Sequence, residues 1–99
     1  MTAAYTFTAE LWEHDGPAAW YFCSLPARVA DDLEAAHGHR AGGFGSLRVE
    51  VCIGATTWCT SVFPDSARRT YVLPVKKAVR RAEALEAGSR VRVALHVVV

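Results

Sequence analysis

The stretch TWCTSVFPDSARRTYVLPVKKAVRRA, which runs from Thr57 to Ala82, contains the elements that decide the fold. TWCTSVF (57–63) predicts a strand, PDSARR (64–69) a turn, and TYVLPV (70–75) a second, shorter strand. Pro74 ends the second strand, because proline has no N–H to donate to a central ladder. VKKAVRRAEAL (75–85) then predicts a helix with an apolar stripe of Val75, Ala78, Val79, Ala82 and Leu85.

The flanking sequence predicts further strands at YTFTAELW (5–12), AAWYFCSL (18–25), LRVEVCI (47–53) and RVRVALHVVV (90–99). YTFTAELW and LRVEVCI alternate apolar and polar residues, which is typical of strands with one buried face. AAWYFCSL is apolar on both faces, which indicates that both faces are covered. PARVADDLEAAH (26–37) predicts a helix that begins near Pro26 and ends at Gly38.

Short strands joined mostly by tight turns favour a mainly β fold with two short α-helices. We expect a small closed or partly open β-barrel of about six strands, with the helices covering its openings. A weak repeat supports this fold: SLPARVADDL and VLPVKKAVRRA both have Leu-Pro followed by a helix, and each is followed by a glycine and an Arg-Val strand. The 99 residues are enough for one domain, predicted to span 1–99.

Composition excludes several classes of protein. The chain is 52% hydrophobic and has a net charge of +1, which fits a packed globular domain with no general attraction to nucleic acid or membranes. No segment approaches the ~20 apolar residues needed to span a bilayer, and the N-terminal residues do not resemble a signal peptide. We therefore expect a soluble, cytoplasmic protein without a membrane partner or a cofactor.

The basic residues of the second predicted helix are its most unusual feature. Lys76 and Lys77 fall in the first turn, where the helix dipole disfavours cations, and Arg80 and Arg81 follow at the spacing of like-charge pairs. A bound phosphate or carboxylate would make this arrangement favourable. Lys76, Lys77 and Arg80 are therefore the predicted anion contacts. The alternative interpretation is a solvated basic face with no ligand.

The preceding strand supplies the predicted neighbours of such a site, Trp58, Thr60 and Ser61. Trp58 and Thr60 share one strand face, where they could line a small pocket or simply pack. Ser61 lies on the other face, and no nucleophile motif surrounds it. No catalytic residue is therefore predicted.

The cysteines and histidines give weaker signals. Cys23, Cys52 and Cys59 lie in apolar or alternating runs, which predicts buried free thiols, with a reactive Cys59 as the alternative. His37 and His39 flank Gly38, but two ligands do not make a metal site. No metal is therefore predicted. The glycine-rich RAGGFG (40–45) is not a phosphate-binding loop, and Phe44 within it could plug a barrel end.

Four blocks, AAWYFCSLP, GFGSLRVEVCIG, TTWCTSVFP and TYVLPVKKAVRRAEALEAGSRVRVAL, resemble the bacterial and archaeal family called domain of unknown function 1905. The resemblance covers nearly the whole chain. It implies a compact β-barrel of unknown activity, found alone or joined to a YdeI/OmpD-associated domain. Cys59 stands where the family often has a basic residue, and Gly88-Ser89 where it often has Gly-Asp.

The expected function is a non-catalytic binding module for a small anionic ligand or a protein partner. An alternative is nucleic-acid binding through the basic helix face together with Arg68 and Arg69 of the preceding turn. An enzyme that uses Ser61 or Cys59 is a third reading, and whether the protein is an enzyme stays open. A homodimer could form if the apolar C-terminal strand lay at a sheet edge.

Overall fold

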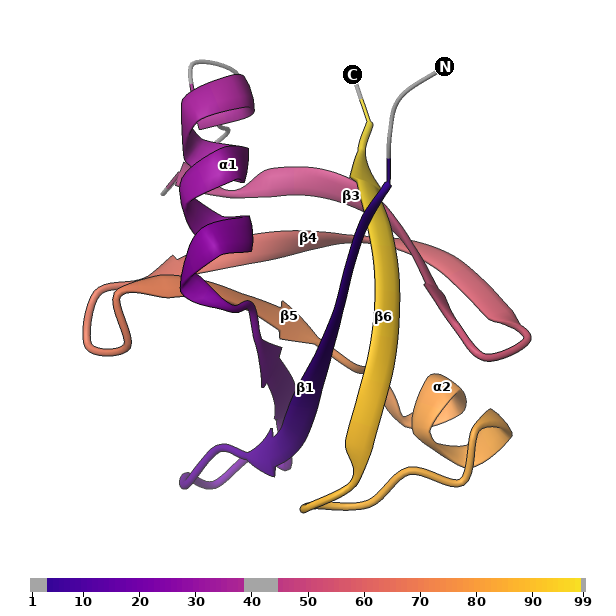
Figure 1. The fold of residues 1–99 in the computed structure, drawn as a ribbon. Helices are drawn as coiled ribbons and strands as arrows, with labels where there is room; N and C mark the ends of the chain where they lie inside the picture. The colour runs from indigo at the N-terminus through magenta and orange to yellow at the C-terminus, as the bar shows by residue number, and fades with distance from the viewer. Residues whose placement is uncertain (1–3, 39–44, 99) are drawn as a thin grey trace.

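The structure, a computed structural model, describes residues 4–38 and 45–98. Its strands are Tyr5–Glu13 (β1), Tyr21–Ser24 (β2), Leu47–Ile53 (β3), Thr56–Asp65 (β4), Thr70–Pro74 (β5) and Arg90–Val97 (β6). Its helices are Ala27–His37 (α1) and Lys77–Ala82 (α2). The strands pair antiparallel in the order β1-β2-β5-β4-β3-β6 and close into a barrel (Figure 1). The predicted mainly β barrel with two helices is confirmed.

The two longest strands close the barrel because each changes partner along its length. The first part of β1 (5–10) pairs with β6, and its last part (11–13) pairs with β2. In the same way, β4 pairs with β3 over 56–62 and with β5 over 63–65. Each long strand therefore belongs to two sheets, and the two sheets share these strands as corners.

The weak sequence repeat corresponds to a repeat in the topology. Exchanging β1 with β4, β2 with β5 and β3 with β6 leaves the order of neighbouring strands unchanged. Equivalent hydrogen bonds join the halves: Leu25 N–H donates to Tyr71 O at 3.0 Å, and Val75 N–H donates to Tyr21 O at 2.9 Å. Each half is therefore a hairpin, a helix and a strand, and β2 and β5 meet at the centre of the repeat.

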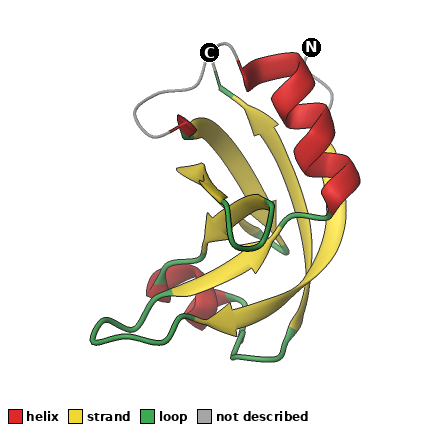
Figure 2. Cartoon of the chain, turned by 90° about the vertical axis from the view of Figure 1, so that its left-hand side faces the viewer, coloured by secondary structure: helices red, strands yellow, loops and turns green. Residues whose placement is uncertain are grey.

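The core fills the barrel and extends beneath α1. Inward-facing residues alternate with outward-facing ones along β3, where Leu47, Val49, Val51 and Ile53 are buried as predicted. Helix α1 stands at one end of the barrel, and α2 lies towards the other (Figures 1 and 2). Helix α1 buries Val29, Ala30 and Leu33, whereas α2 buries Val79 alone of its residues. The two helices therefore cover their ends of the barrel unequally.

Two sequence-based expectations about the elements are wrong. The second helix ends at Ala82 and does not reach Leu85, because Ala84 adopts a left-handed φ of 53° that breaks the helix. The C-terminal strand β6 is not at an edge, since it pairs with β1 on one side and with β3 on the other. Closure of the barrel thus removes the basis for dimerisation through β6. Phe44 and most of the RAGGFG loop lie outside the described residues.

The β3–β4 turn is tied to the residues just after α2. The Thr56 hydroxyl donates a hydrogen bond of 2.7 Å to a Glu83 carboxylate oxygen. Gly54, in this turn, has a φ of 58°, and a Cβ atom at this position would collide with the Glu83 carboxylate. A glycine at residue 54 therefore allows the turn to lie directly against Glu83.

We expect Gly54→Ala to destabilise the fold by about 1–2 kcal/mol from left-handed backbone strain, and by about 1 kcal/mol more because the displaced Glu83 carboxylate loses the hydrogen bond from Thr56. Urea unfolding of the single and double variants would measure this. In a Glu83→Ala background the collision is absent, so Gly54→Ala should cost less there than in the wild-type chain. Equal costs in the two backgrounds would contradict the close approach.

Alkaline pH should destabilise the folded protein through two core residues. Burial raises the pKa of Cys23 from 9.0 to about 12. Burial, and after it the hydrogen bond and charge of Glu34, raises the pKa of Tyr71 from 10.0 to about 12. The unfolded chain loses these protons first, so their stabilisation is complete below about pH 9 and is lost as pH rises towards 12.

The test is denaturant unfolding between about pH 8 and pH 11, where the free energy of unfolding should fall. Cys23→Ala lacks one of the two ionising groups, so its decline with pH should be shallower. A free energy of unfolding that stays constant over this range would contradict the expectation.

Candidate functional site

A cavity of about 560 Å³ opens between β4 and the start of α2. Its size falls within the usual range for small-molecule sites. The residues that line it come from the β1–β2 hairpin, from β4 and from the segment that leads into α2. They are Ala19, Trp20, Tyr21, Trp58, Cys59, Thr60, Phe63, Pro74, Val75, Lys76, Lys77 and Arg80.

The cavity lies where β4 and β5 separate. Their ladder runs from the pair Asp65–Thr70 to the pair Phe63–Val72. Pro74 then has no N–H to offer β4, and Val75 N–H donates to Tyr21 O of β2 at 2.9 Å. Beyond Phe63, β4 therefore faces the Pro74–Lys76 segment across the cavity and not across a ladder. This separation exposes residues from both faces of β4 to one space.

Arg80 has a fixed position in the wall of the cavity. Its Nε donates to Val75 O at 3.1 Å. Its guanidinium carbon lies 3.8 Å from the centre of the Tyr21 ring, a cation–π contact. Because Nε is already bonded, the two terminal nitrogens are the groups that remain for a ligand. Arg80 therefore presents a positive charge held in place before any ligand arrives.

Lys76 and Lys77 add two positive charges at the same cavity. Both side chains are exposed, and neither forms an ion pair within residues 4–38 and 45–98. Glu83 lies three residues after Arg80, but its carboxylate accepts the hydrogen bond from Thr56 and forms no ion pair with Arg80. The three cations at the cavity therefore have no acidic partner among the described residues.

The short length of α2 changes the basis of the predicted anion site. Lys76 is the residue before the helix, and the helix has only six residues. A helix this short contributes little dipole, so the positive charges of the side chains are what an anion would meet.

Two of the three predicted neighbours line the cavity and one does not. Trp58 and Thr60 pair with buried Val51 and Val49 of β3 and are themselves half-buried. Ser61 pairs with Arg48 and is not among the residues that line the cavity. The structure thus brings together Trp58, Thr60, Lys76, Lys77 and Arg80 and leaves Ser61 outside.

Sequence reasoning missed the aromatic residues beside the cavity. Trp20 lines it and is 54% exposed, and Phe63 lines it and is 42% exposed. The signal was the doubly apolar run AAWYFCSL, from which we predicted that both faces would be covered. Cys23 is buried inside the barrel, as predicted, but the outer face around Phe22 is covered only in part, by Trp12 and Trp20.

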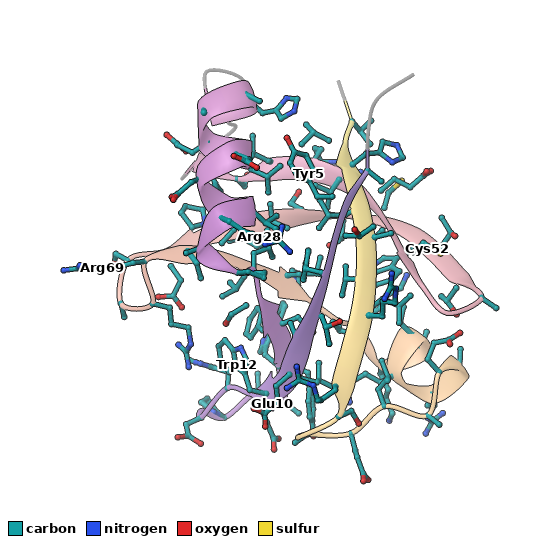
Figure 3. All side chains as sticks on the ribbon, in the orientation of Figure 1. Tyr5, Glu10, Trp12, Arg28, Cys52 and Arg69 are labelled. Carbon is teal, nitrogen blue, oxygen red and sulfur yellow. The ribbon has the colours of Figure 1, made fainter. Side chains whose placement is uncertain are left out.

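The basic residues of the β4–β5 turn do not join this site. Arg68 lies 3.7 Å above the Trp12 ring and pairs with Asp65 at 3.3 Å. Arg69 and Lys76 lie at opposite ends of β5, which separates them by roughly 20 Å. In Figures 1 and 3, Arg69 and its turn project from the side of the barrel away from α2. The predicted patch of six cations is therefore divided.

The prediction of buried thiols is correct for Cys23 and wrong for Cys52 and Cys59, which are exposed on outer positions of β3 and β4. Figure 3 shows Cys52 on the β3–β4 hairpin. His39 lies outside the described residues, and within those residues no three potential ligands cluster around a metal position. None of the described helices is long and apolar enough to cross a membrane.

Comparison with known proteins identifies one family. The family described as domain of unknown function (DUF1905) matches residues 7–95. No curated protein matches the chain.

The three thiols should differ in reactivity. Cys52 and Cys59 are exposed, whereas burial keeps the pKa of Cys23 near 12 and its thiol protonated at neutral pH. We expect iodoacetamide to alkylate Cys52 and Cys59 in the native protein and Cys23 only after unfolding. Peptide mass spectrometry would assign the sites. Native alkylation of Cys23, or protection of both others, would contradict the structure.

Proposed function

We propose that this chain, which belongs to the family described as domain of unknown function (DUF1905), is a non-catalytic binding module for a small anionic ligand. The observation that carries the proposal is the convergence of Trp58, Thr60, Lys76, Lys77 and Arg80 on one cavity. The ligand would lie between β4 and the start of α2, with its negative charge towards the three cations.

The repeat supports a functional origin for these charges. Helix α1 occupies the position equivalent to α2 and carries Asp31, Asp32 and Glu34. The barrel therefore forms with an acidic helix in one half and a basic helix in the other. The fold therefore does not require basic residues at this position. Binding of an anionic ligand would explain why Lys76 and Lys77 are present there without acidic partners among the described residues.

Other readings of the site remain proposals of lower rank. A protein partner could present a carboxylate to the same cavity. Nucleic-acid binding would have to rely on the basic residues of α2, because Arg68 and Arg69 lie at the other end of β5. The cytoplasmic location stays a prediction from the sequence. A homodimer is untested, and its sequence-based argument no longer applies because β6 is paired on both sides.

Inorganic phosphate tests the proposal, with Cys59 as the reporter. Cys59 lines the cavity, and Cys52 lies on the same hairpin outside it. We expect millimolar phosphate, at constant ionic strength, to slow alkylation of Cys59 and to leave Cys52 unaffected. Phosphate should also raise the free energy of unfolding by RT ln(1 + [L]/Kd), and therefore the melting temperature. If phosphate leaves the alkylation rate of Cys59 unchanged, as it should that of Cys52, the proposal is overturned.

A pair of variants on α2 separates specific binding from general charge. Lys77 and Arg81 are both exposed cations, but Arg81 does not line the cavity. Lys77→Ala should weaken phosphate binding about fivefold, since one exposed charged contact contributes about 1 kcal/mol. Arg81→Ala should leave the affinity nearly unchanged. Equal losses in the two variants would indicate nonspecific charge attraction.

A further inference from the structure

The outer face of β1, β2, β5 and β4 carries an unusual number of apolar side chains. Trp12, Phe22 and Pro74 lie side by side in one cross-strand row, and Val72 and Phe63 lie in the next. The outer face of a barrel in water is normally polar. This row of rings therefore requires either a covering partner or a packing role.

The chain itself covers part of this surface. The Trp12 indole N–H donates to the Ser24 hydroxyl at 2.9 Å, and Arg68 covers the Trp12 ring. Both the indole N–H and the ring of Trp12 therefore have partners within the chain. Trp20 is different, because its ring stacks on Phe22 at 9° and 6.0 Å between centroids and still remains 54% exposed. A flat aromatic surface is left open at Trp20.

Two cavities meet at this ring. One, of about 500 Å³, is walled by the β1–β2 hairpin together with Phe22 and Val72. The other is the cation-lined cavity of the proposed site. Trp20 and Phe63 line both. The two cavities therefore adjoin at Trp20 and Phe63, and Lys76, Lys77 and Arg80 line the second of them.

We propose that the ligand is a small molecule in which a planar aromatic ring is joined to a phosphate monoester, the chemistry of a mononucleotide. The ring stacks on Trp20 and extends the Trp20–Phe22 pair, and the phosphate reaches the three cations. The inference deepens the proposed function and rests on it.

Charge balance favours a phosphate over a carboxylate. A phosphate monoester carries about −1.5 to −2 at neutral pH, against −1 for a carboxylate. Three unpaired cations match the larger charge better.

Four probes separate the parts of the proposal: adenosine 5′-monophosphate, adenosine, inorganic phosphate and 1-naphthoate. Each is titrated against the full chain by calorimetry, and Cys59 alkylation is the independent readout of occupancy. We expect adenosine 5′-monophosphate to bind at least tenfold more tightly than adenosine or phosphate, because ring and charge act together. We also expect it to bind more tightly than naphthoate.

Variants at Trp20 test the stacking directly. Trp20 is exposed, so its replacement should leave the barrel folded. Trp20→Ala should weaken adenosine 5′-monophosphate about tenfold and inorganic phosphate much less, since base stacking is worth roughly that factor. Trp20→Phe keeps a ring and should restore most of the loss. Arg81→Ala serves as the control with unchanged affinity for both.

Each outcome decides a different part. If phosphate binds as tightly as adenosine 5′-monophosphate, or if Trp20→Ala weakens both equally, stacking on Trp20 is overturned and the proposed anion site stands. If naphthoate binds as tightly as adenosine 5′-monophosphate, the assignment to phosphate is overturned. If none of the charged probes binds or protects Cys59, the proposed function fails together with this inference.

Discussion

The missing N–H of Pro74 is the constraint on which the cavity depends. A closed antiparallel barrel ordinarily pairs each strand on both sides, which leaves no gap between neighbouring strands in its wall. Here the β4–β5 ladder ends at the pair Phe63–Val72, whereas β5 stays paired with β2 as far as Pro74, and Val75 N–H, just after β5, donates to Tyr21 O. The barrel stays closed because β4 is still held by β3, while a gap opens on its other side.

The internal repeat explains why one gap becomes a cavity. Both halves contain a strand that separates from its neighbour and a helix that follows a short strand. In the first half, the eleven residues of α1 bury Val29, Ala30 and Leu33 against the core. In the second half, α2 has six residues and buries Val79. The shorter helix α2 leaves the cavity beside it unfilled. Lys76, Lys77 and Arg80 line this cavity, whereas α1 carries acidic residues.

The sequence was informative where the physics is local. Alternation identified β1, β3 and β4 as strands and predicted one buried face for β1 and β3, since side chains alternate along any strand. It was silent where the physics is long-range. The apolar stripe of the second predicted helix continues through Ala82 to Leu85. The apolar pattern therefore did not indicate that α2 ends at Ala82. The partner of Glu83 is Thr56, 27 residues away, and depends on where the barrel places the β3–β4 turn.

The same distinction applies to the site. Lys76, Lys77 and Arg80 were found because they are close in sequence, and Trp58 and Thr60 because they precede them on an adjacent strand. Trp20 comes from the other half of the chain, and only the pairing of β2 with β5 brings it beside Val75. In the proposed site, the exposed lysines are screened by solvent and would contribute modest affinity. Most of the selectivity of the proposed site would therefore come from its apolar walls, among which the ring of Trp20 is 54% exposed.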